Sequence, residues 1–377
     1  MTGRISLLVL TAAASMLPRV LGGQALAQLA LRPPNATIDA EFIGVTSIRE
    51  VADGRAIVTD GRDQKLYLVD FSTRRAELLG RKGRGPGEWL NVGLIYPTQG
   101  DSSILSDFGN LRWLLLAGAQ IVGTVPSDHP AVRATNSMQS GVDRLGHVLM
   151  LTRKPRRSGP QVFTGKDSMS VVFVDRNTGH MDTVATLRER PHRMETVTDA
   201  KGRVVSSMPV ATEPNARAER AELFNDGWLA VVRLEPLRVD WRAPNGTWTY
   251  GKPLQLRPEP VDPAERRAIL QRRAEAVQEA KRHGLPSPPS FEFPTTLPVI
   301  TFSASPRQMP DGRLALARTP SASQQTLRYV VINRRGGIDG ELRLGKREAI
   351  LGFGERSVYV VATDDDDIQR LRRHPWP

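Results

Sequence analysis

The chain has 377 residues, of which 40% are hydrophobic and 24% charged, with 32 glycines, 28 prolines and no cysteine. This composition excludes a small disulfide-stabilised scaffold and allows one large domain that is stabilised by its core. The formal net charge of +12 predicts weak attraction to anionic surfaces. No RNP, helix-turn-helix or zinc-finger pattern occurs in the sequence, which argues against nucleic-acid binding.

The first 27 residues predict an export signal. Arg4 precedes an apolar run from Ile5 to Leu17, and Ala25-Leu26-Ala27 supplies a small-x-small cleavage pattern. A run of 13 residues is too short to span a bilayer, which favours cleavage over a retained signal anchor. We expect a signal peptide over residues 1–27, no transmembrane segment in the mature chain, and a periplasmic or secreted location. Cleavage removes two arginines and no acidic residue, so the net charge falls by two, from +12 to +10.

Two stretches of the sequence, 47 residues apart, follow one template. The run Ala56–Asp60 is an apolar strand that ends in Asp, with Lys65 five residues after it, and Ser103–Asp107 is followed in the same way by Arg112. The Gly- and Pro-rich residues 83–89 separate the two stretches. A period of about 40 to 50 residues with short strands and turns is typical of a propeller or a solenoid.

Turn residues followed by apolar β runs mark six units along the chain. The markers are Asp53-Gly54, Gly100-Asp101, Asp143 to Gly146, Asp226-Gly227, Asp311-Gly312 and Gly354-Glu355. A seventh unit that begins at Asp199 is disfavoured, because only 27 residues separate it from Asp226. We therefore predict an all-β fold, a six-bladed β-propeller over residues 28–377.

The spacing of the markers doubles at two places, which predicts two insertions. Residues 189–221 are expected to form an added hairpin and loop. Residues 262–298 are expected to form a helix and a Pro-rich return, because Asp262, Pro263 and Glu265 form a helix start and the pattern continues to about His283. We favour a solvated helix that lies across one face of the ring, with a partner-binding or channel-capping helix as the alternative.

The last unit is short of strands. Its residues supply Ser357–Thr363, a turn, and Ile368–Arg373. The segment Ala36–Val45 is a candidate for the missing outer strand, and this pairing would join the two ends of the chain and protect exposed strand edges.

Three motifs carry a resemblance to known repeats. Residues 107–113, DFGNLRW, resemble the strand end of NHL-type repeats, in which Asp, Asn and Arg follow an apolar strand, and residues 83–89, GRGPGEW, resemble the linker before the next NHL blade. Residues 226–232 and 238–241 resemble bacterial exported six-bladed propellers of the TolB-like group. The resemblance covers most of residues 40–373 and implies the fold, but it implies no activity, because propellers host many functions.

The candidate binding residues come from these motifs. They are Arg84, Glu88, Trp89, Asp107 and Arg112. Charged pairs such as Asp60/Lys65 and Asp107/Arg112 would line a central channel in a binding site, whereas in an architectural role they would hold turn amides and keep blades in register. No G-x-S-x-G elbow and no cysteine nucleophile occurs, so we predict no catalytic residue.

No metal site is predicted either. The run Asp364–Asp367 has carboxylates that suit Ca²⁺, but it lacks the D-x-D-x-D-G spacing and falls where a hairpin turn is needed. The six histidines, at positions 129, 147, 180, 192, 283 and 374, show no metal-ligand spacing. We predict no cofactor and leave a divalent cation open.

Two function classes fit these observations. The first is a monomeric exported binding module whose ring holds a ligand or another envelope protein, and this is the reading that we favour. The alternative is a metal-dependent hydrolase or lyase of the lactonase-like kind, in which Glu, Asn and Asp from different blades hold a divalent ion in the central channel. Whether the chain is an enzyme is left open, with the absence of a catalytic motif favouring a non-enzyme.

Overall fold

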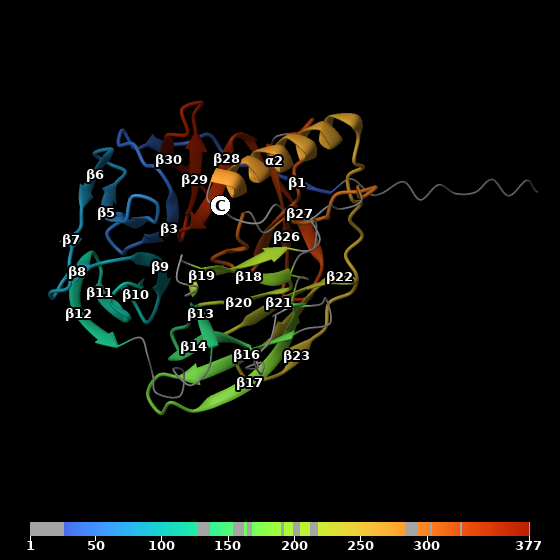
Figure 1. The fold of residues 1–377 in the computed structure, drawn as a ribbon. Helices are drawn as coiled ribbons and strands as arrows, with labels where there is room; N and C mark the ends of the chain where they lie inside the picture. The colour runs from blue at the N-terminus through green and yellow to red at the C-terminus, as the bar shows by residue number, and fades with distance from the viewer. Residues whose placement is uncertain are drawn as a thin grey trace, which may run out of the picture.

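The computed structural model describes residues 26–126, 136–153, 162–163, 168–189, 192–198, 204–211, 218–282, 293–301, 304–324 and 326–376. Within these residues the strands form the predicted six-bladed β-propeller, and one α-helix is added to it. Figure 1 shows the colours passing around the ring from blue through green to red, so that the first and last blades are neighbours. Residues 1–25 of the predicted signal peptide lie outside the described part of the chain.

The first three blades each contain four antiparallel strands, which follow one another in chain order from the centre of the ring outward. Blade 1 consists of β3 (Val45–Glu50), β4 (Ala56–Asp60), β5 (Lys65–Asp70) and β6 (Arg75–Leu78). Blade 2 consists of β9 (Val92–Pro97), β10 (Ser102–Asp107), β11 (Arg112–Ala117) and β12 (Gln120–Pro126). Blade 3 consists of β13 (Asn136–Val142), β14 (His147–Arg153), β16 (Ser168–Asp175) and β17 (Met181–Arg188).

The last three blades follow the same plan, and two of them gain a strand from the start of the chain. Blade 4 consists of β20 (Arg220–Leu223), β21 (Leu229–Leu234), β22 (Leu237–Arg242) and β23 (Trp248–Thr249). Blade 5 consists of β24 (Arg307–Gln308), β25 (Leu314–Ala317), β26 (Thr326–Ile332), β27 (Ile338–Lys346) and β1 (Gln28–Leu29). Blade 6 consists of β28 (Glu348–Phe353), β29 (Ser357–Thr363), β30 (Gln369–Pro375) and β2 (Ala36–Thr37).

The Asp-Gly markers of the sequence lie in the turns between the first and second strands of the blades. Gly54, Gly227 and Gly312 have φ angles of 83°, 86° and 84° there, a left-handed conformation that favours glycine. The innermost strand of each blade therefore precedes its marker, whereas the strand that follows the marker is the second strand. This assignment decides which residues reach the centre of the ring.

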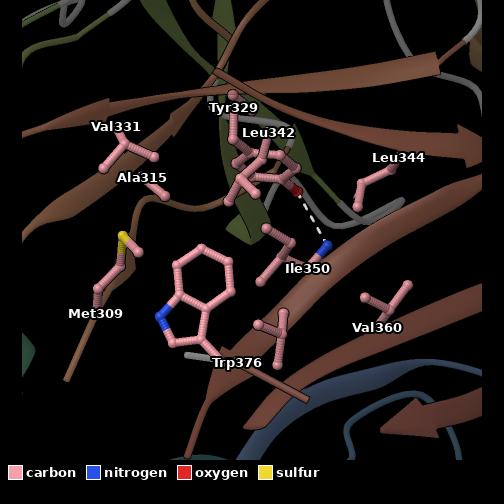
Figure 2. Close-up of a cluster of buried hydrophobic side chains, with 11 residues drawn as sticks. Met309, Ala315, Tyr329, Val331, Leu342, Leu344, Ile350, Val360 and Trp376 are labelled. Carbon is pink, nitrogen blue, oxygen red and sulfur yellow. Dashed lines mark hydrogen bonds between the residues drawn. The ribbon is translucent and has the colours of Figure 1, made fainter. Parts of the chain in front are cut away.

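Apolar side chains fill the space between neighbouring blades. Figure 2 shows the cluster between blades 5 and 6, where Tyr329 of β26 meets Ile350 of β28 and Trp376 beyond β30. The amide of Ile350 donates a hydrogen bond of 3.2 Å to the Tyr329 hydroxyl. Burial of these side chains contributes strongly to holding the blades together, because the strand-pairing hydrogen bonds are made within each sheet.

The segment at the start of the described chain closes the ring. Strand β2 pairs in antiparallel fashion with β30 as the outer strand of blade 6, which confirms the predicted closure. The Phe42 main chain is bridged to Gln369, and the Phe42 side chain is only 1% exposed. Strand β1 pairs in parallel with β27, and just before it the Ala27 carbonyl accepts a 2.8 Å hydrogen bond from Glu341.

The regions predicted as insertions carry extra elements. Strands β18 (His192–Thr198) and β19 (Val204–Ala211) form an antiparallel hairpin, to which β15 (Val162–Phe163) adds. Residues 220 and 221, which were expected in the first insertion, belong instead to the innermost strand β20.

Helix α2 (Pro263–Arg282) begins where the sequence predicts, with the Asp262 carboxylate accepting a 2.7 Å hydrogen bond from the Glu265 amide. Residues 283–292 of the Pro-rich return lie outside the described part of the chain. Among the described residues, no helix has both the length and the apolar character needed to span a membrane.

Candidate functional site

The five candidate residues predicted from the sequence do lie together, at the junction of blades 1 and 2. Asp107 is at the end of β10 and is 1% exposed. Its carboxylate accepts hydrogen bonds of 3.1 Å from the amides of Leu90 and Asn91, and hydrogen bonds of 2.6 and 3.3 Å from the side chains of Asn110 and Arg112. Asp107 therefore ties the segment that enters blade 2 to the end of that blade's second strand.

The other four residues hold the Gly-rich segment against this anchor. The Arg112 guanidinium donates to the carbonyls of Arg84, Gly85 and Glu88 at 3.2, 3.0 and 2.7 Å. The Glu88 carboxylate accepts from the Gly85 amide at 2.7 Å, and this bond is the main cause that holds its pKa below the ordinary value.

Trp89 lies in β8 (Glu88–Trp89), which pairs in parallel with β7 (Arg81–Lys82). The Trp89 side chain is 1% exposed, and its indole nitrogen donates to the Gln64 carbonyl. The contacts described for the five candidate residues are thus made with the chain itself, which fits the architectural role.

A second location has the geometry of a ligand site. The centre of the ring contains a cavity of about 660 Å³. All six innermost strands line this central channel, through Thr46–Arg49 of β3, Leu94–Pro97 of β9, Ser140 and Gly141 of β13, Arg220–Glu222 of β20, Arg307 and Gln308 of β24, and Leu351–Phe353 of β28. No residue of α2 is part of the described wall, so the structure does not support a channel-capping helix.

The alternation of β20 explains how two charged side chains reach the channel. Ala221 and Leu223 are both 2% exposed and pack in the core between blades 3 and 4. Because successive side chains of a strand point to opposite faces, Arg220 and Glu222 project from the other face. The sequence Arg-Ala-Glu-Leu thus places a charged pair on the channel wall.

Glu222 is the acidic residue at the centre of this site. Its carboxyl group is surrounded by protein, although the channel leaves it partly open to solvent. Desolvation raises the pKa of Glu222 from 4.5 to about 7, and the positive charges of Arg220 and Arg307 oppose this rise without cancelling it. Across the channel, burial raises the pKa of the Tyr96 hydroxyl, and the Glu222 carboxylate adds to that rise.

Backbone contacts fix Arg307 beside Glu222. The Arg307 Nε donates a 2.9 Å hydrogen bond to the Ile350 carbonyl, and the amide of the same Ile350 is held by Tyr329 (Figure 2). The next residue, Gln308, donates at 2.7 Å to the Leu223 carbonyl, which joins β24 to β20. Burial lowers the pKa of Arg307. Arginine guanidinium groups remain cationic in proteins at neutral pH.

The described wall has an excess of positive charge. Arg334 and Asp226, near one end of the channel, form an ion pair of 2.7 Å and cancel each other. The other charged side chains of the wall are Arg49, Arg144, Arg220, Arg307 and Glu222, and Arg49 forms an ion pair of 3.8 Å with Asp101 outside the wall. Apart from Arg49, three arginines and one carboxyl group, which is about half ionised at pH 7, make the channel attractive to anions.

This arrangement does not fit a divalent cation. Among the described residues, no three His, Asp or Glu side chains converge as metal ligands would. The carboxylate of Glu222 lies within the electrostatic influence of Arg220 and Arg307, which would repel a metal ion. The run Asp364–Asp367 forms the turn between β29 and β30, where Asp364 accepts two turn amides and Arg347 pairs with Asp365 and Asp367.

The sequence analysis missed the channel residues Tyr96, Glu222, Arg307 and Arg49. A signal for them was present, because each precedes one of the turn markers by a few residues. The alternating pattern at 220–223, directly before Asp226-Gly227, is the clearest example.

The comparisons with known proteins add no residue to this site. Neither a protein-family profile nor a curated protein sequence matches the chain, so membership of the NHL or TolB-like group stays a prediction. The calcium-binding protein regucalcin from Agrobacterium tumefaciens is 11% identical, and the match covers 94% of this chain and 97% of regucalcin with a TM-score of 0.42.

Two enzymes match the chain with similar sequence identity, coverage and TM-score. A catalytically inactive virginiamycin B lyase from Staphylococcus aureus is 10% identical, with 89% of this chain and 97% of the lyase covered and a TM-score of 0.41. A luciferin-regenerating enzyme is 12% identical, with 90% and 94% covered and a TM-score of 0.41. Such values carry neither an activity nor a ligand to this chain.

Proposed function

We propose that the protein is an exported binding module that holds a small ligand in its central channel. The observation that supports this function is the cavity of about 660 Å³ at the meeting point of all six innermost strands. Small-molecule sites typically have volumes of about 300 to 1,000 Å³ and combine apolar walls with a few fixed polar groups. The channel has this composition, because Leu94 and Phe353 share the wall with Glu222 and Arg307.

Export and family are part of the same proposal. The pattern over residues 4–27 supports secretion to the periplasm or the medium, where the ligand would be encountered. The motifs at 83–89 and 107–113 support an NHL or TolB-like propeller, since their residues pack together between two blades. An envelope protein as a further partner, and a monomeric state, remain predictions of the sequence.

A metal-dependent hydrolase or lyase is not proposed. That activity needs several ligands that converge on one ion, and the described channel wall offers a single carboxylate that is not already in an ion pair.

A channel-blocking variant tests the proposed function. Leu94 of β9 lies in the channel wall and is 43% exposed, so Leu94→Trp fills the cavity without disturbing the core. Leu78→Trp is the matched control, because Leu78 of β6 is 60% exposed on the outer strand of blade 1. The melting temperature of each protein is measured against a library of fragment-sized carboxylates, sulfonates, amines and neutral compounds.

We expect some compounds to raise the melting temperature of the wild type and of Leu78→Trp but not of Leu94→Trp. A compound at about a hundredfold its dissociation constant stabilises the folded state by about 2.7 kcal/mol, which is readily measured. The proposal is wrong if no compound binds, or if the compounds stabilise Leu94→Trp as much as the wild type.

A further inference from the structure

We propose that the channel ligand is a small organic oxyanion, a carboxylate or sulfonate with an apolar part, and that it binds when Glu222 carries a proton. This inference rests on the proposed channel function and names the chemistry of the ligand and the state of the site that accepts it.

Arg307 has hydrogen-bond donors that a ligand in the channel can use. Arg307 lines the channel, and its Nε is bonded to the Ile350 carbonyl, while no hydrogen bond of its two terminal nitrogens is found among the described residues. A guanidinium that is fixed at Nε presents the remaining donors in a planar fork, which matches two oxygens of a carboxylate or sulfonate. Arg220, two residues before Glu222 in β20, adds positive charge near the carboxyl group of Glu222.

An ionised Glu222 competes with an anionic ligand for the positive charge in this part of the channel. When ionised, Glu222 occupies the field of Arg220 and Arg307 and repels a second negative charge. When protonated, it no longer competes with the ligand for the positive charge of Arg307 and offers a hydroxyl that donates to an oxyanion. The pKa of about 7 makes the two states nearly equal in population at neutral pH, so that a ligand can select between them.

The groups that face Glu222 come from three strands. They are Arg220 on β20, Arg307 on β24 and Tyr96 on β9. Strand β13 contacts β20, and the residues of β13 whose surroundings are described, Ser140, Gly141 and Val142, do not titrate. Tyr96 stays neutral at pH 7 because its pKa is raised, so Glu222 is the group of this set that changes charge near neutral pH.

Apolar side chains of the channel wall suit an apolar part of the ligand. Leu94 exposes 43% of its surface, and Ile48, Leu351 and Phe353 also belong to the wall. An inorganic ion would leave this apolar surface in contact with water, whereas an organic anion covers it.

The experiment uses benzenesulfonate and its neutral analogue benzenesulfonamide as probes. Benzenesulfonate keeps its negative charge over the whole range used, so any pH dependence comes from the protein. Dissociation constants are measured by calorimetry at about pH 6 and about pH 8 for the wild type, Glu222→Gln and Arg307→Lys, with folding of each protein checked by thermal melting.

For the wild type we expect the affinity for benzenesulfonate to fall about tenfold between these two pH values, as the protonated fraction of Glu222 falls. Binding at the higher pH should also take up about one proton per ligand. Glu222→Gln should bind equally well at both pH values, and Arg307→Lys should bind more weakly at both, because it keeps the charge but loses the fork. Benzenesulfonamide should bind at least about tenfold more weakly than benzenesulfonate, because it lacks the charge.

Three results would overturn the inference: equal affinity for the two probes, a wild-type affinity for benzenesulfonate that does not change with pH, or no binding of benzenesulfonate. The channel function is judged separately by Leu94→Trp. If other compounds bind in a way that Leu94→Trp abolishes, the proposed function stands although the oxyanion inference is wrong.

Discussion

Asp107 anchors the entry to blade 2 in the same way that Asp60 anchors the entry to blade 1. The Asp60 carboxylate accepts hydrogen bonds of 2.8 and 3.1 Å from the consecutive amides of Ile43–Gly44. The Asp107 carboxylate accepts two bonds of 3.1 Å from the consecutive amides of Leu90–Asn91. Both aspartates end the second strand of a blade and are 1% exposed. The repeated Asp of the sequence is therefore a structural anchor of the propeller.

The first prediction is that Asp107→Ala lowers the free energy of unfolding by about 3 kcal/mol. The substitution leaves two amides and the Nε of Arg112 without their acceptor and removes the buried carboxylate that pairs with the Arg112 charge. Asp63→Ala is the control, because Asp63 pairs with Lys65 at the surface and should lose no more than about 0.5 kcal/mol. Urea unfolding measures the loss of unfolding free energy in both variants. Equal losses in the two variants would show that Asp107 is not an anchor.

The sequence predicts the outer three strands of most blades because these strands are apolar and follow recognisable turns. The run Ala56–Asp60 is completely buried between blades, and this burial explains its uniform hydrophobic pattern. The innermost strands lack such a signal. Strand β24 is only Arg307–Gln308, and β20 alternates charged with apolar residues. A strand that lines a wet channel resembles a loop in sequence.

Each channel residue precedes a turn marker in the sequence, but the convergence of these residues on one site could not be predicted. Tyr96, Glu222 and Arg307 come from three blades and are separated by more than 80 residues from one to the next. Closure of the ring brings them together, and the sequence contains no spacing that reports this. By contrast, Asp107 and Arg112 are close enough in sequence to be predicted as a pair, although their contacts are architectural.

The second prediction concerns pH and stability. Folding raises the pKa of Glu222 from 4.5 to about 7, so between these values the folded state binds more protons than the unfolded state. The free energy of unfolding therefore falls as the pH rises through this window and levels off above it. The difference corresponds to about 3 to 4 kcal/mol at most, since the pKa rises from 4.5 to about 7 and one pKa unit is about 1.4 kcal/mol.

Glu222→Gln removes this dependence. Subtracting its unfolding free energy from that of the wild type, at several pH values, isolates the effect of Glu222. Glu88→Gln is the control, because the pKa of Glu88 is lowered and its contribution disappears only as the pH falls below the ordinary value of 4.5. A wild-type curve parallel to that of Glu222→Gln above about pH 5 would contradict the prediction.

The third prediction is that Glu265 fastens helix α2 to blade 5. Its carboxylate is 3% exposed and accepts hydrogen bonds from the Ala322 amide at 2.6 Å and from Arg272 at 3.0 Å. Glu265→Ala should speed amide hydrogen exchange in α2 about tenfold to a hundredfold, because the helix loses the hydrogen bond between the buried Glu265 carboxylate and the Ala322 amide. Glu275→Ala, on the exposed face of the same helix, should leave the exchange rates unchanged. Similar rates in the two variants would show that other contacts hold the helix.

The last prediction tests closure of the ring. Phe42 is 1% exposed, exchanges two main-chain hydrogen bonds with Gln369, and packs edge-on against Tyr67 at 5.3 Å between ring centroids. It therefore joins blade 6 to blade 1, and Phe42→Ala should lower the free energy of unfolding by about 3 to 5 kcal/mol. The adjacent Ile43 is 42% exposed, so Ile43→Ala should change the free energy of unfolding by about 0.5 kcal/mol or less. Because the two residues are neighbours in sequence, a comparable small loss in both would mean that the segment does not close the ring.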